Sequence, residues 1–330
     1  MRKIIYLIGL VLIVSCENKP SKVEERSFID LGGEKQYVEM VGVSSNDPVL
    51  FFIHGGPGWP QTPYLRYFNA DLTKKVILVS WDQAGCGKSF ANDSTPKSLS
   101  LDKFVNDAHE LTQILKKKFN KDKIYLAGFS WGSVIGLRLA EKYPEDYEAY
   151  FGISQVIDIE KNIRLSREWI KEQAKNNKDT ATMNVLERLD KSDTSLCKNQ
   201  MDCFLKQFEQ LSKYHGAIFD PRIEKEIDTM MTTYDDYKNY DWMGGFKYSA
   251  SRLEKDLFSI DLTGIKELKV PAYFFVGRHD WNVPASITQE FVSNLKAPKK
   301  EIVWFENSGH EPLEEEADKF NKEILNRINE

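Results

Sequence analysis

Three residues, Ser130, Asp280 and His310, could together form a nucleophilic catalyst. A serine hydroxyl attacks a carbonyl carbon when a histidine accepts its proton and a carboxylate orients that histidine. Each of the three residues comes just after a segment that we expect to be a strand. Because the carboxyl ends of parallel strands lie along one edge of a sheet, where such sheets bind their ligands, we expect the three side chains to meet there.

The serine lies in the pentapeptide Gly-Phe-Ser-Trp-Gly at residues 128–132. We expect a strand over Lys123–Ala127 before it and a helix from Trp131 to about Tyr143 after it. Glycines permit the sharp turn that lifts a serine hydroxyl out of the end of a sheet, and the N-terminus of the following helix favours negative charge. The pattern therefore predicts that Ser130 is the nucleophile.

A second glycine-rich motif, His-Gly-Gly-Pro-Gly at residues 54–58, follows an expected strand. Glycines let backbone N–H groups approach a substrate oxygen, so we expect the N–H groups of Gly56 and Trp131 to form an oxyanion hole. His54 is expected to fix this loop through hydrogen bonds. The three other histidines are weaker candidates for the base than His310; they are His109, His215 and His279.

Short β-branched segments alternate with helical ones over residues 27–154 and 269–330. This alternation is typical of an α/β protein with a mostly parallel sheet flanked by helices. Residues 155–268 between them are charged and predict several amphipathic helices, which we interpret as an inserted helical cap. The expected strands are Lys35–Val41, Val49–Ile53, Val76–Ser80, Lys123–Ala127, Ala149–Ile153, Ala272–Val276 and Glu301–Phe305.

The composition is that of a globular protein. The 330 residues include 45 Lys and Arg against 50 Asp and Glu, which gives a net charge of −5. This balance leaves no basic excess for a phosphate backbone, so nucleic acid is not expected as a partner. The sequence contains no metal-ligand pattern and no phosphate-binding glycine loop, and we expect neither a metal nor a cofactor.

The N-terminus has the pattern of a targeting segment. Arg2 and Lys3 precede an apolar run over Ile4–Val14 that is too short to cross a bilayer as a helix. The sequence Ile-Val-Ser-Cys at residues 13–16 resembles the lipobox of bacterial lipoproteins. We expect a signal peptide over residues 1–15 and lipid on Cys16, with a tether over residues 16–26 that holds the protein in the cell envelope, outside the cytoplasm. The alternative is an ordinary secretory signal with an incidental cysteine.

Two further cysteines, Cys197 and Cys203, lie in the insertion with five residues between them. An oxidising compartment would allow them to form a disulfide, and the sequence leaves open whether they pair.

Together these motifs resemble the α/β-hydrolase superfamily and, within it, the proline iminopeptidase family of serine peptidases. The resemblance depends on residues 54–58, 81–89 and 128–133 and on the Asp280 and His310 loops. It implies that the insertion is the family's cap, whose carboxylates hold the free amino group of the substrate, but no motif selects one here. Ala84 and Lys88 stand where the family usually has Arg, so the network around Asp82 must differ.

The favoured hypothesis is a lipid-anchored serine aminopeptidase of proline iminopeptidase type. It would release N-terminal residues from short peptides through an acyl-enzyme. A carboxylesterase or lactonase would use the same three residues, and the sequence does not separate the two. A non-catalytic surface lipoprotein that uses the fold to bind a ligand is a third hypothesis.

Overall fold

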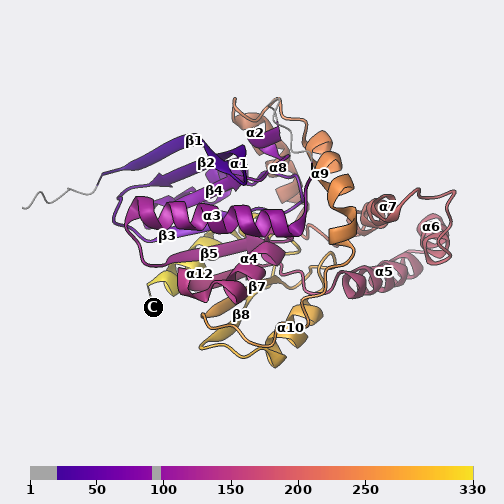
Figure 1. Cartoon of the computed structure of the whole chain (residues 1–330). Helices are drawn as coiled ribbons and strands as arrows, with labels where there is room; N and C mark the ends of the chain where they lie inside the picture. The colour runs from indigo at the N-terminus through magenta and orange to yellow at the C-terminus, as the bar shows by residue number, and fades with distance from the viewer. Residues whose placement is uncertain (1–20, 91–97, 330) are drawn as a thin grey trace, which may run out of the picture.

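One sheet of eight strands, in the order β1-β2-β4-β3-β5-β6-β7-β8, forms the centre of the molecule (Figure 1). The structure is a computed structural model that describes residues 21–90 and 98–329. β1 and β2 pair antiparallel, as do β2 and β4, and the other neighbours are parallel. The strands are β1 (Val23–Leu31), β2 (Glu34–Gly42), β3 (Val49–Ile53), β4 (Ile77–Asp82), β5 (Ile124–Phe129), β6 (Tyr147–Ile153), β7 (Ala272–Gly277) and β8 (Lys300–Phe305). The predicted α/β fold with a mostly parallel sheet is confirmed.

Alternation along the central strands divides the core between the two faces of the sheet. In β3 all five residues are buried: Phe51 packs with the helices of one face and Phe52 with those of the other. The first face carries α3 (Leu101–Phe119), α4 (Trp131–Lys142) and α10 (Ala285–Asn294), and the second carries α1 (Thr62–Phe68) and α12 (Ala317–Ile328). A strand covered on both faces needs apolar residues at every position, which explains its continuous apolar run.

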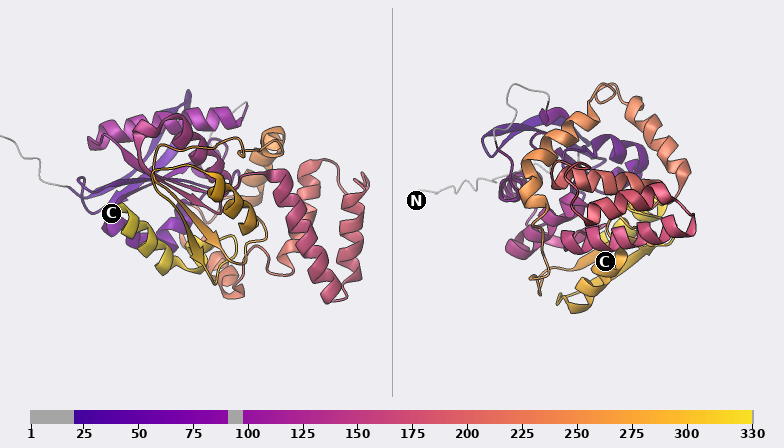
Figure 2. Two further views of the ribbon diagram at one scale, coloured as in Figure 1. Left: turned by 90° about the horizontal axis from the view of Figure 1, so that it is seen from below. Right: turned by 90° about the vertical axis from the view of Figure 1, so that its right-hand side faces the viewer.

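Five helices occupy the chain between β6 and β7 and project from one end of the sheet (Figures 1 and 2). We call this part the cap. It touches the loops that follow the carboxyl ends of the parallel strands, since Gly216 accepts a hydrogen bond from the backbone N–H of Trp281. The cap helices are α5 (Ile159–Asn176), α6 (Thr180–Asp190), α7 (Gln200–Ser212), α8 (Pro221–Thr233) and α9 (Trp242–Leu257).

The first strand begins inside the segment that we expected to be the tether. Residues 23–26 belong to β1, which pairs with β2 along its full length, from Val23 opposite Gly42 to Leu31 opposite Glu34. Only these two end residues of β1 are buried. The tether boundary at residue 26 was therefore wrong. The sequence did not reveal this strand, because an edge strand with polar side chains is held by backbone pairing and gives little apolar signal.

A disulfide joins Cys197 to Cys203 and closes the connection between α6 and α7, with the two Cα atoms 5.1 Å apart. The expected lipid site, Cys16, lies outside the described residues, as does the whole expected signal peptide. Within residues 21–90 and 98–329, no helix combines the length and apolar character needed to cross a membrane.

Candidate active site

The structure brings Ser130, His310 and Asp280 into one hydrogen-bonded series. Nε2 of His310 lies 3.0 Å from Oγ of Ser130, and Nδ1 of His310 lies 2.9 Å from Oδ2 of Asp280. The other carboxylate oxygen of Asp280 accepts a hydrogen bond of 2.7 Å from the backbone N–H of Val283, which fixes the carboxylate. With Nδ1–H donating to Asp280, a neutral His310 presents the lone pair of Nε2 to the serine hydroxyl.

Ser130 occupies a strained turn between β5 and α4. Its φ of 50° and ψ of −117° place a residue with a side chain in a sparsely populated region, as a nucleophile elbow requires. The glycines on either side allow the turn to close: a Cβ on Gly128 would overlap the backbone oxygen of Gly132, and one on Gly132 would overlap those of Ile53 and His54. The Gly-x-Ser-x-Gly spacing is thus a packing requirement at this site.

The surroundings of His310 favour its charged form. Burial by itself would lower the pKa of the imidazole, but the charge and hydrogen bond of Asp280 outweigh burial and raise the pKa above the ordinary 6.5. Asp280 can therefore stabilise the imidazolium that forms when His310 accepts a proton.

The loop of residues 54–58 lies against the serine. His54 is fully buried, with Nδ1 2.8 Å from the carbonyl oxygen of Gly55 and Nε2 accepting a hydrogen bond from the backbone N–H of Gln83. Burial lowers the pKa of His54 to about 4, so the side chain stays neutral and holds the loop. A Cβ on Gly55 would lie 3.2 Å from Cβ of Ser130, which shows how closely this loop approaches the serine. The role of the Gly56 and Trp131 N–H groups as an oxyanion hole stays a prediction.

The remaining histidines lie elsewhere. The ring of His109 stacks on Tyr143 at 3.6 Å, the ring of His279 stacks on Phe219 at 3.7 Å, and His215 is exposed. Within the described residues, no group of three or more metal-ligating side chains is placed to hold a metal ion.

The cap segment that links α7 and α8 is hydrogen-bonded to the loops that carry His310 and Asp280. The carbonyl oxygen of Gly216 accepts from the N–H of Trp281, next to Asp280, and that of Ala217 accepts from the N–H of His310 at 2.6 Å. The N–H of Phe219 donates to Glu315 at 2.9 Å. No sequence motif marks this segment, because its contacts use backbone atoms.

A buried carboxylate, Asp82, connects the core to the cap. It lies near Ala84 and Lys88 in the chain, the two positions at which the proline iminopeptidase family usually has Arg. It accepts hydrogen bonds from Thr62, from the N–H of Lys88 and, at 2.6 Å, from the hydroxyl of Tyr237 in the cap. Burial outweighs these bonds and raises the pKa of Asp82 to about 6. The ammonium of Lys88 lies over the Tyr237 ring and pairs with Asp236 of the cap.

Arg66 also pairs with Asp236, at 2.9 Å, and with the buried Glu39. The second departure, Ala84, is buried in the core and makes no polar contact through its methyl group. Lys88 and Arg66 together thus attach the cap to the core through one carboxylate, Asp236.

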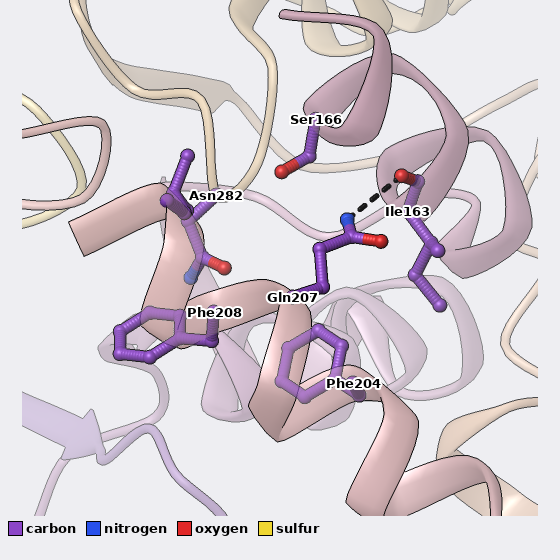
Figure 3. A pocket seen from close by; sticks show the side chains of 7 residues that line it. Ile163, Ser166, Phe204, Gln207, Phe208 and Asn282 are labelled. Atoms are coloured by element: carbon purple, nitrogen blue, oxygen red, sulfur yellow. Dashed lines mark hydrogen bonds between the residues drawn. The ribbon is translucent and has the colours of Figure 1, made fainter. Parts of the chain in front are cut away.

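A small hollow inside the cap lies between α5 and α7, beside Asn282 of the Asp280 loop (Figure 3). The amide of Gln207 crosses it and donates to the carbonyl oxygen of Ile163 at 2.9 Å. None of the three residues of the hydrogen-bonded series lines this hollow, so it is separate from the site. Its lining residues are Ile163, Ser166, Phe204, Gln207, Phe208, Leu211 and Asn282.

Two glutamates next to His310 were not predicted from the sequence as part of the site. Glu311 directly follows His310, and Glu314 is buried with its Oε1 accepting a hydrogen bond of 2.6 Å from Gln61. The acidic run over residues 314–316 is a visible signal, but a charge run most often marks a solvated surface. Only the turn into α11 (Pro312–Glu315) shows that the chain buries one of these carboxyl groups.

Comparisons with known proteins agree with this architecture. The family model described as alpha/beta hydrolase fold matches residues 48–317, and the chain belongs to that family. A probable aminopeptidase of Bacillus subtilis, YbaC, is 31% identical over 296 residues, which cover 88% of this chain and 92% of that protein.

The resemblance to proline iminopeptidases is likewise confirmed. A proline iminopeptidase of Saccharolobus solfataricus is 24% identical over 313 residues, covering 90% of this chain and 89% of its own. The crystal structure of a proline iminopeptidase-related protein from Thermus thermophilus superposes with a TM-score of 0.64 at 20% identity. That superposition covers 92% of this chain and 96% of the other.

Proposed function

We propose that the protein is a serine hydrolase in which Ser130 is the nucleophile, His310 the general base and Asp280 the orienting carboxylate. The observation that carries the proposal is the continuous series of hydrogen bonds, 3.0 Å from Ser130 to His310 and 2.9 Å from His310 to Asp280. Both distances lie within the reach that proton transfer requires.

In the proposed reaction, Nε2 of His310 takes the hydroxyl proton of Ser130 while Oγ attacks the carbonyl carbon of the substrate. The N–H groups of Gly56 and Trp131 would stabilise the negative charge on the carbonyl oxygen. The imidazolium, held by Asp280, then gives its proton to the leaving group, and an acyl-enzyme forms. A water molecule, deprotonated by His310 in turn, releases the acyl group and restores Ser130.

The proposed substrates are short peptides with a free N-terminus, proline among the candidate first residues. The names of the relatives in Bacillus subtilis and Saccharolobus solfataricus support a peptidase over an esterase. The hydrogen-bonded series by itself does not distinguish a peptidase from an esterase, because esters and amides need the same nucleophile and base.

The test compares prolyl and alanyl arylamides with free and blocked amino groups, beside a short-chain aryl ester. We expect cleavage of the free-amine arylamides only, abolished in Ser130→Ala and retained in Ser251→Ala, which alters an exposed serine of α9. Undiminished turnover by Ser130→Ala would refute the proposed nucleophile. Ester cleavage without arylamide cleavage would replace the peptidase by an esterase.

We also propose that lipid on Cys16 holds the protein in the cell envelope, on the sequence pattern alone. Cells that express the chain and its Cys16→Ser variant should differ in incorporation of labelled fatty acid and in membrane association. Equal incorporation in the two would refute the lipid site.

A further inference from the structure

The strand β6 ends at a residue with an unusual backbone conformation. Ser154, which directly follows this strand, has a φ of 46° and is 2% exposed. A positive φ brings Cβ close to the backbone, so residues other than glycine seldom adopt it. Ser130, which follows the neighbouring strand β5, shares this feature with a φ of 50°. Two adjacent parallel strands thus end in strained serines, and strain of this kind is concentrated at functional sites.

Backbone hydrogen bonds join the ends of three neighbouring strands. The N–H of Ser130 donates to the carbonyl oxygen of Ile153 at 3.0 Å, and the N–H of Ser154 donates to that of Phe275 in β7 at 2.9 Å. These bonds continue the pairing of the parallel sheet past the ends of β5 and β6. Because Ile153 directly precedes Ser154, the backbone of Ser154 is held in a fixed position relative to that of Ser130.

The side chain of Ser154 contacts the main chain of His310. Its hydroxyl donates to the carbonyl oxygen of His310 at 2.8 Å in a buried environment, and the two residues are 156 positions apart in the sequence. The N–H of the same histidine donates to the carbonyl oxygen of Ala217 in the cap at 2.6 Å. His310 lies in the loop between β8 and α11, and this loop is therefore held from one side by the cap and from the other by the sheet.

A glycine at position 154 would form the same bend without strain. Serine at this position carries the cost of a positive φ and uses its hydroxyl at a distant loop, on the carbonyl oxygen of His310. The bend of the chain after β6 does not require that hydroxyl. Its contact with His310 points instead to a role in the site.

We propose that Ser154 is a positioning residue, whose hydroxyl holds the main chain of His310 where Nε2 of the imidazole meets Oγ of Ser130. The inference rests on the proposed function, in which His310 is the base. A displacement of about 1 Å in a reacting group can lower a rate by roughly 10²-fold. Without the hydroxyl, the hydrogen bond to Ala217 would remain, but that acceptor belongs to the cap and not to the sheet that carries Ser130.

The experiment measures how fast an alkyl fluorophosphonate labels the serine. In this reaction Oγ displaces fluoride from phosphorus while the base takes the hydroxyl proton, so the rate reports on the nucleophile and base for a peptidase and an esterase alike. Mass spectrometry locates the adduct on Ser130. In Ser154→Ala and Ser154→Gly the limiting rate at saturating reagent should fall by about 10- to 100-fold. The concentration that gives half of this rate should change little, because alignment of the base acts on the reaction step.

Thr112→Val is the matched control. It also removes one buried hydroxyl, which donates to the carbonyl oxygen of Ala108 within α3 at 2.9 Å. The variant should label at the wild-type rate even if its free energy of unfolding is lower. A rate loss as large as that of Ser154→Ala would show that any buried hydroxyl has this effect, and it would overturn the proposal.

The glycine variant separates the hydroxyl from the shape of the backbone. Ser154→Gly should be at least as stable to urea as Ser154→Ala, because glycine adopts a φ of 46° without strain. It should nevertheless lose the same fraction of the labelling rate. A wild-type rate in Ser154→Gly would overturn the proposal, because only the bend would then matter, and this variant serves as the test if Ser154→Ala does not fold.

The outcomes distinguish this proposal from the proposed function. A wild type that is not labelled, or labelling that persists in Ser130→Ala, would refute the nucleophile itself. Labelling of Ser130 at one rate in the wild type and in both Ser154 variants would refute the role of Ser154 alone. A change in the half-saturating concentration with an unchanged limiting rate would also overturn it, because Ser154 would then act on binding of the reagent.

Discussion

The hydrogen bond from Tyr237 to Asp82 links the cap to the core, and its removal should destabilise the protein in a pH-dependent way. Tyr237 lies between α8 and α9, is 2% exposed, and donates its hydroxyl to Oδ2 of Asp82 at 2.6 Å. The substitution Tyr237→Phe removes the donor and keeps the ring. The pKa of Asp82, raised to about 6 by burial, decides whether the acceptor is charged.

The expected loss in the free energy of unfolding of Tyr237→Phe depends on the charge of Asp82. At pH 8 Asp82 is ionised, and a hydrogen bond to a charged group contributes about 2 kcal/mol, which corresponds to a fall of ~3 °C in Tm for a chain of this length. At pH 5 the carboxyl group is mostly protonated, and the loss should drop to about 1 kcal/mol, that of a neutral pair. The sign follows from linkage: losing the donor raises the pKa of Asp82 further, so the difference in the free energy of unfolding grows as pH rises through 6.

Urea unfolding of the wild type and the variant at pH 5 and pH 8 measures this difference. Tyr150→Phe is the matched control, because this tyrosine of β6 is also buried, its hydroxyl donates to the neutral side-chain oxygen of Gln155 at 2.6 Å, and its loss should not depend on pH. The same destabilisation of Tyr237→Phe at both pH values would refute the reasoning, because the hydrogen bond would then not depend on ionisation of Asp82 between pH 5 and pH 8.

Other parts of the structure lead to three more expected outcomes. The pH profile of kcat/KM should rise with pH through a midpoint above 6.5, because His310 acts as base only when neutral and Asp280 raises its pKa; a midpoint below 6.5 would contradict this. Gly132→Ala should lower the free energy of unfolding by about 3 kcal/mol or more, since its methyl group would overlap the backbone oxygen of Ile53; denaturant unfolding tests it. Replacing both Cys197 and Cys203 by Ser should lower the free energy of unfolding by about 2 kcal/mol, because the disulfide no longer restricts the unfolded chain to a closed loop. Calorimetry of the wild type and the double variant tests this, and an unchanged Tm would contradict it.

Much of the fold and the core of the site could be predicted from sequence, because they rest on local signals. The apolar run of β3 and the Gly-x-Ser-x-Gly turn before α4 each depend on nearby residues. The approach of Asp280 and His310 to Ser130 then follows from parallel strands, whose carboxyl ends share one edge.

The rest depends on contacts between distant segments. β1 is an edge strand held by backbone pairing, so its side chains carry little information on it. The hydrogen bond of Gln61 to Glu314 joins residues 253 positions apart, and without it the acidic run looks like an ordinary solvated surface. The hydrogen bond of Tyr237 to Asp82 likewise joins residues 155 positions apart, one in the cap and one in the core, and no local pattern predicts it.

The hydrogen bonds of Gly216 and Ala217 join the cap to the two loops that carry Asp280 and His310. These two consecutive carbonyl groups hold the N–H of Trp281 and the N–H of His310. If the segment moved away with the cap, both N–H groups would lose their acceptors at once, one in the His310 loop and one next to Asp280. Any displacement of this cap segment would therefore remove backbone contacts from the loops that carry Asp280 and His310. We therefore expect the position of the cap, as well as the sheet, to determine how well His310 is aligned with Ser130.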